Sequence, residues 1–133
     1  MLLVTKRTRV LAHTTLWLMV GCAPMIVTEP AAMKQIAADA HAMQIQLRQS
    51  VNIMLTTQYA RTLPEGSRWR RVGALTQGDV YRPVDTVFTI EGRQVHEAYL
   101  VIASGVLVGF YLPGESNFSP IPNPLPLSFG EIK

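Results

Sequence analysis

Apolar residues in the first half of the chain recur at steps of three and four, the spacing of one face of an α-helix. Six residues fall on that face: Met33, Ile36, Ala40, Met43, Leu47 and Met54. Three others widen the stripe: Ile45, Val51 and Leu55. Thr28 is a candidate N-cap and Pro30 suits a first helical turn, while Pro64 and Gly66 favour a turn beyond the stripe. The pattern predicts one long amphipathic helix from about Pro30 to about Arg61.

Beyond Gly66 the pattern shortens toward the period of two that is typical of strands. Four segments are predicted strands: 68–75, 85–90, 95–103 and 106–112. Turn signals separate them at 76–79, at 91–93 and at Ser104-Gly105. The segment 106–112 (VLVGFYL) is apolar on both faces, so we expect both faces to be covered, with the helix as one cover. The sequence therefore predicts an α+β domain, in which one long N-terminal amphipathic helix packs on a small antiparallel sheet of three to four strands.

The C-terminal residues 119–133 form a Pro-rich segment that we expect to be an extended tail. Prolines stand at 120, 122, 124 and 126, a spacing that forbids helix and central strand and favours polyproline II. The tail is a rigid spacer or a docking peptide. As a docking peptide it would present four apolar side chains to a partner: Ile121, Leu125, Leu127 and Phe129. Packing of these side chains on the protein's own domain would also explain them.

The N-terminus has the layout of a targeting segment. Lys6, Arg7 and Arg9 precede an apolar stretch, Val10–Val20, which is shorter than the roughly 20 residues that span a bilayer. Cys22 follows and is the only cysteine, so an intramolecular disulfide is impossible. A transmembrane anchor and a buried core thiol are the alternatives for this region.

Leu18-Met19-Val20-Gly21-Cys22 resembles the lipobox of bacterial lipoproteins, with methionine where leucine is commonest. The resemblance covers residues 1–22 only. It implies that residues 1–21 are a signal peptide cut before Cys22, and that residues 22–29 are a lipidated tether. In that class the thiol carries diacylglycerol and the new amino terminus an acyl chain, and we expect no other cofactor. Ala23, in place of aspartate, implies the periplasmic face of the outer membrane.

Removal of the signal changes the charge argument. The three basic residues lost with it account for the whole net charge of +3, because the remainder holds nine basic and nine acidic residues. A neutral mature chain argues against nucleic-acid binding. Taking 21 residues from 133 leaves 112, enough for a single domain, which we place at 30–118.

We find no motif for catalysis, for metal binding or for a small-molecule substrate in the sequence, and expect no enzyme. The one basic cluster of the mature chain is Arg68-Trp69-Arg70-Arg71. On a strand, Arg68 and Arg70 share one face, and Trp69 and Arg71 share the other. The cluster is either a solvated sheet edge protected by charge, or a contact to anionic lipid headgroups or to an acidic protein partner.

Two classes of function remain after these exclusions. The first is a structural or assembly subunit that fixes an envelope protein complex to the outer membrane. The architecture is loosely similar to small lipoproteins of conjugative and type IV secretion systems. The second is an inhibitor, immunity or exclusion lipoprotein that blocks an incoming protein. Neighbouring genes would discriminate between the two.

Overall fold

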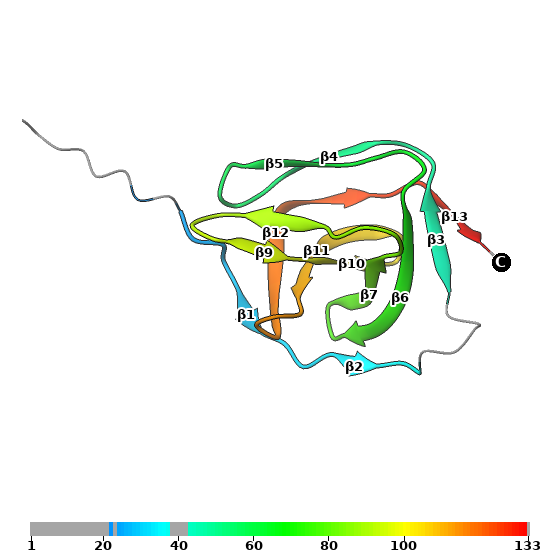
Figure 1. The fold of residues 1–133 in the computed structure, drawn as a ribbon, viewed down its shortest axis with the longest axis horizontal. Helices are drawn as coiled ribbons and strands as arrows, with labels where there is room; N and C mark the ends of the chain where they lie inside the picture. Colours follow the sequence, from blue (N-terminus) through cyan, green and yellow to red (C-terminus); the bar gives the residue numbers. More distant parts are fainter. Residues whose placement is uncertain (1–21, 23, 38–42, 133) are drawn as a thin grey trace, which may run out of the picture.

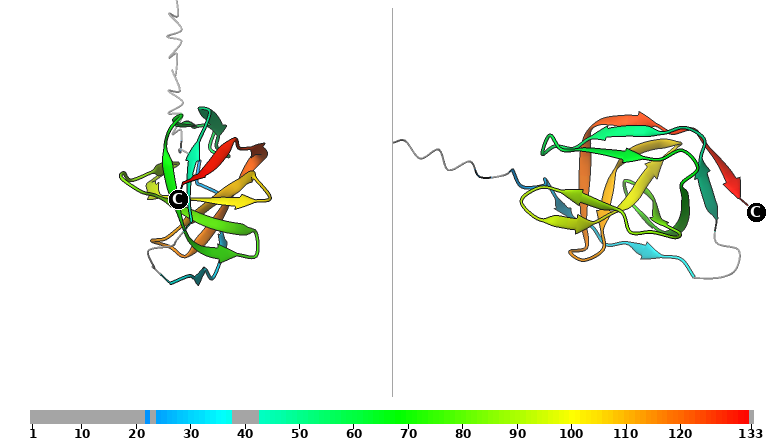
Figure 2. Two further views of the ribbon diagram at one scale, coloured as in Figure 1. Left: turned by 90° about the vertical axis from the view of Figure 1, so that its right-hand side faces the viewer. Right: turned by 45° about the horizontal axis from the view of Figure 1, so that its top comes forward.

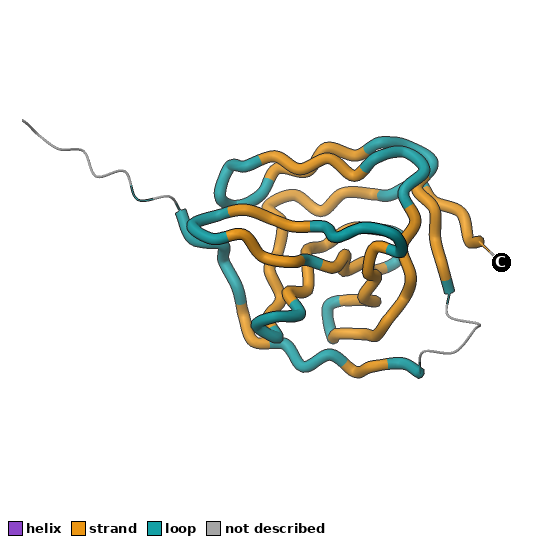
Figure 3. The backbone as a smooth tube through the Cα atoms, viewed as in Figure 1, coloured by secondary structure: helices purple, strands orange, loops and turns teal. Residues whose placement is uncertain are grey.

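The computed structural model describes residue 22 and residues 24–37 and 43–132, and these residues form an antiparallel β-structure (Figures 1 and 3). The first strands are β1 (Glu29–Pro30), β2 (Lys34–Gln35), β3 (Gln44–Leu47), β4 (Val51–Met54), β5 (Ala60–Leu63) and β6 (Arg68–Leu75). The later strands are β7 (Gly78–Pro83), β8 (Thr89–Glu91), β9 (Val95–Glu97), β10 (Tyr99–Ala103), β11 (Val106–Leu112), β12 (Asn117–Pro126) and β13 (Phe129–Ile132).

Nine of these strands form one sheet in the order β1-β12-β11-β10-β7-β6-β3-β13, with β2 also paired to β6. The sheet curls so that one segment of chain contributes near both of its ends. Strand β12 pairs with β11 near one end, and β13, which begins after two intervening residues, pairs with β3 at the other end. Two backbone bonds hold this junction: Leu127 N–H donates to Gly105 O over 2.9 Å, and Arg48 N–H donates to Ser128 O over 2.8 Å. Two hairpins, β4–β5 and β8–β9, lie beside the sheet (Figure 2).

The predicted helix over residues 30–61 is wrong, and so is the α+β fold class: the described part of this segment contains β1 to β5 instead. The stripe at Met43 and Leu47 also fits a period of two, because a spacing of four satisfies both patterns. In β3, Ile45 and Leu47 are buried and Gln46 is exposed, and in β4 Ile53 is buried between exposed neighbours. Ala40, another residue of the predicted stripe, lies outside the described residues.

The strand predictions fared better toward the C-terminus. The strands at 68–75 and 106–112 are confirmed with the predicted bounds, as β6 and β11. The segment 95–103 is divided by Ala98 into β9 and β10, and only the end of 85–90 pairs, as β8. The Ser104-Gly105 link is confirmed as a hairpin turn, with φ of 51° and 76°, the positive values that a tight two-residue turn requires.

The Pro-rich segment is a strand of the sheet rather than a free tail. It belongs to β12, which runs across the predicted domain end at residue 118 and pairs with β11. Alternate residues of a strand direct their backbone N–H groups to the same side, so the four prolines remove donors from one side only. The residues between them keep their N–H groups on the side that faces β11, and the strand can therefore pair along that edge.

Two apolar clusters cover the two faces of the sheet. The inner cluster fills the curl and includes the fully buried Phe110, Leu100 and Ile45, together with side chains from both hairpins. The outer cluster contains Val80, Val101, Tyr111 and Phe118, and the segment Ala31–Met33 packs over it. Strand β11 therefore has both faces covered, as its sequence predicts, although curvature and the N-terminal segment provide the covers in place of a helix.

A candidate partner-binding groove

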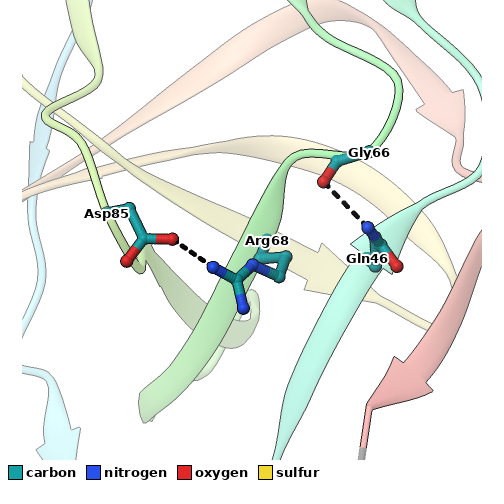
Figure 4. Close-up of polar contacts among 4 residues, drawn as sticks. All are labelled: Gln46, Gly66, Arg68 and Asp85. Atoms are coloured by element: carbon teal, nitrogen blue, oxygen red, sulfur yellow. Dashed lines mark hydrogen bonds and ion pairs between the residues drawn. The ribbon is translucent and has the colours of Figure 1, made fainter.

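The four residues of the basic cluster on β6 have different surroundings. Trp69 is 2% exposed in the inner cluster, where its indole N–H donates to Ser67 Oγ over 3.0 Å and its ring meets the edge of Phe88. Arg68 lies on the outside and forms an ion pair with Asp85, and the neighbouring Gln46 donates to Gly66 O over 3.1 Å (Figure 4). Folding alone accounts for both Trp69 and Arg68.

The remaining two arginines, Arg70 and Arg71, differ in whether they have an ion-pair partner. Arg71 Nη2 donates to Asp79 Oδ1 over 2.8 Å, a pair that is partly shielded from water. Arg70 is exposed, and its direct cross-strand partner is Arg82 on β7. Neither Arg70 nor Arg82 has an ion-pair partner within the described part of the chain. Like charges at directly opposed positions destabilise a sheet, so folding alone gives no reason for this pair.

The Arg70–Arg82 pair borders a groove on the outer face of the sheet, with a volume of about 480 Å³. Its walls come from β2 and the residues after it, from β6 and β7, and from β10 and β11. Apolar and aromatic side chains supply most of the remaining lining: Met33, Ile36, Ala37, Val72, Tyr99, Tyr111 and Pro113. Three polar or charged residues complete it: Gln35, Arg71 and Ser116. The close approach of the β2 segment to β6 requires glycine at position 73, where a Cβ atom would come within 2.7 Å of Lys34 O.

Tyr99 and Tyr111 are cross-strand partners whose ring centroids lie 6.3 Å apart, and they form the aromatic wall of the groove. Burial raises the pKa of Tyr99 above its ordinary value, and the negative charge of Glu97 adds to that rise. The charge of Arg82 acts in the opposite sense on the same pKa. Tyr99 therefore keeps its proton at neutral pH and can donate a hydrogen bond.

The groove combines the two exposed guanidinium groups of Arg70 and Arg82 with an apolar and aromatic wall. Guanidinium groups bind carboxylate or phosphate through paired hydrogen bonds, and tyrosine offers a rigid apolar surface with a polar tip. A segment of protein that carries both acidic and apolar side chains matches this lining. Of the predicted site residues, Arg70 and Arg71 line the groove; the side chain of Arg70 is exposed, whereas that of Arg71 is paired with Asp79.

The sequence analysis did not predict three important groove residues as site residues: Arg82, Tyr99 and Tyr111. The signal at Arg82 was the alternation of Val80-Tyr81-Arg82-Pro83, which we did not interpret as a strand. The register that places Arg82 opposite Arg70 depends on the bulge between Arg71 and Gly73, and no local sequence pattern specifies it.

The apolar side chains of the C-terminal segment contact the protein's own inner cluster. Ile121 is buried within it, and three partly buried side chains pack against it: Leu125, Leu127 and Phe129. The structure thus supports the alternative that these residues belong to the domain. Cys22 is exposed, whereas the rest of the lipobox and the signal segment lie outside the described residues.

Another polar contact involves side chains that do not line the groove. His96 Nδ1 and Glu115 Oε1 are 2.6 Å apart and link β9 to the turn between β11 and β12. Among the described residues, no group of three or more His, Cys, Asp or Glu side chains could hold a metal ion. In the same part of the chain, no helix has the length and apolar character needed to cross a membrane.

No protein-family model, curated protein or solved structure matches this chain. Its function must therefore be argued from its own residues.

Proposed function

We propose that this protein is a lipoprotein of the bacterial outer membrane, anchored through Cys22, and that it serves as a structural or assembly subunit of an envelope complex. The role in the complex is to hold an acidic segment of a partner protein in the groove beside Arg70 and Arg82. The observation that carries the proposal is the opposed arginine pair. Its repulsion destabilises the sheet, and an anion bound between the two guanidinium groups would offset that repulsion.

The lining favours a protein segment over a simple anion. A sulfate or phosphate ion needs only the cationic end, whereas the apolar wall of Met33, Ile36 and Tyr111 needs an apolar ligand surface. An extended peptide bound along the groove could contact the arginines and the apolar wall at the same time. Exposed Gln35 on β2 lies at the groove and could donate to such a peptide's backbone.

Site-specific photo-crosslinking in native cells tests the partner. A photoreactive phenylalanine derivative at Gln35, in the full lipidated chain, should give a defined adduct with another envelope protein. The same derivative at Asn123, which is exposed on β12, should give none. Arg70→Ala should reduce the Gln35 adduct at least several-fold, whereas Arg48→Ala, which removes the same charge elsewhere, should not. An adduct that forms equally well in Arg70→Ala would refute the groove as the binding site.

The anchor has its own test. Cys22→Ser should abolish incorporation of labelled palmitate and leave the signal segment uncleaved, so that a slower-migrating precursor accumulates. Normal processing of that variant would show that the N-terminus is an ordinary secretory signal. That result would not bear on the groove, because the photo-crosslinking experiment tests the groove separately.

A further inference from the structure

Packing contacts of the domain are found only two residues beyond Cys22. The chain at Pro24 and Ile26 lies against Gly92 in the β8–β9 hairpin, where a Cβ atom would come within 2.8 Å of Ile26 Cγ1 and 3.1 Å of Pro24 O. Ile26 also packs against the inner cluster, and Val27 O accepts a bond of 2.8 Å from Ser119 Oγ. At no more than about 3.6 Å per residue, the two steps from Cys22 to Pro24 span only about 7 Å. A lipid on Cys22 would therefore hold this end of the domain against the membrane.

Three segments meet at this end of the molecule. They are the N-terminal segment before β1, the tip of the β8–β9 hairpin and the tip of the β4–β5 hairpin (Figures 1 and 2). Thr57 Oγ1, at the β4–β5 tip, donates to Glu91 O over 2.9 Å and so fixes the two hairpins to each other. The three segments form one surface, which we call the anchor end.

Exposed apolar side chains gather at the anchor end. Seven large hydrophobic side chains are exposed among the described residues, and five of them lie on these segments: Met25, Val27, Met54, Tyr59 and Val95. The other two are Ile36, in the groove, and Val87. Single exposed apolar residues need no explanation, but their concentration beside a lipidated cysteine does.

The charged side chains at this end include one cation that can contact phospholipid. Arg93 is exposed at the β8–β9 tip and can reach lipid phosphates, and Glu115 is paired with His96. Glu91 is half-buried. Tyr59 is 43% exposed, and tyrosine favours the boundary between headgroups and acyl chains.

We infer that the anchor end rests on the phospholipid surface, with Met25, Tyr59 and Val95 in the headgroup region. The acyl chains on Cys22 hold the protein at the membrane, and these side chains fix its orientation there. The inference rests on the proposed lipidation of Cys22.

Fluorescence quenching in a reconstituted membrane tests this orientation. The full lipidated chain is placed in phosphatidylethanolamine–phosphatidylglycerol vesicles that contain lipids with a quencher near the headgroup. Val95→Cys carries an environment-sensitive label, and Gln49→Cys, on the link at the base of the β4–β5 hairpin, carries the same label as the matched control. Both positions are exposed, and acylation of Cys22 leaves the introduced cysteine as the only free thiol.

The label at position 95 should be quenched several-fold more strongly than the label at 49. Equal quenching at the two positions, or quenching at neither, would overturn the orientation. The intact mass separates this failure from failure of the anchor. A chain without acyl mass on Cys22 overturns both proposals, whereas an acylated chain with equal quenching overturns the orientation alone.

Discussion

The two faces of the curled sheet follow different rules. The inner face buries Trp69, Phe110 and Ile121 in one apolar cluster. The outer face keeps Arg70 opposite Arg82 at the edge of a half-apolar groove. The buried apolar residues of the inner face stabilise the fold. On the outer face, the like-charged Arg70–Arg82 pair lowers the stability of the sheet. That pair marks the position where we place the partner.

The largest effect should come from the segment that joins the two ends of the sheet. Deletion of residues 119–133 removes most of β12 and all of β13, and exposes Leu107 and Phe110 of the inner cluster. We expect loss of the cooperative unfolding transition in calorimetry. Asn123→Ala, in the same segment but exposed, should leave the transition in place. A truncated chain that melts at the same temperature would show that the tail is not part of the core.

A smaller but still large effect should separate the two faces within one strand. Phe110 is 1% exposed on the inner face and lies beside Phe88, so Phe110→Ala should cost about 3–5 kcal/mol of unfolding free energy. Val108, on the same strand, lies partly buried in the outer cluster, and Val108→Ala should cost about 1 kcal/mol. Denaturant unfolding measures both, and equal costs would contradict the assignment of the two faces.

Each face also carries a tyrosine whose pKa is raised, chiefly by burial: Tyr81 inside and Tyr99 outside. The unfolded chain loses these protons near the ordinary value of 10.0, before the folded chain does, so stability is complete below pH 10 and falls as pH rises through the folded values. Melting temperatures from pH 9 upward should show this decline. Tyr81→Phe and Tyr99→Phe should each make the decline shallower, and an unchanged slope in both would contradict the burial of these hydroxyls.

The parts of the fold that sequence could predict differ from the rest in a physical way. Strand β11 and its turn to β10 carry local signals: apolar side chains on both faces and a Ser-Gly link at positive φ. Residues 43–55 have no glycine or proline, and their apolar spacing fits helix and strand alike. Contacts across the sheet decide between the two, since Ile45 and Ile53 are buried only when the distant β6 and β12 strands enclose the same core.

Only part of the groove could be predicted from the sequence, for a similar reason. The basic cluster on β6 was evident, but which arginine lacks a counter-charge depends on Asp79 and Asp85, and on the register that brings Arg82 to Arg70. Long-range pairing of this kind leaves no short motif.

The claim that Arg70 serves binding at the expense of folding has one direct test. Arg70→Glu converts the like-charged cross-strand pair into an opposite-charged one, beside Arg68, so the unfolding free energy should rise by about 0.2–1 kcal/mol. The adduct from the photoreactive group at Gln35 should disappear in the same variant. Asn52→Asp, which adds negative charge on the β4–β5 hairpin, should keep the adduct. A variant Arg70→Glu that is less stable than the natural chain, or that still forms the adduct, would contradict the account.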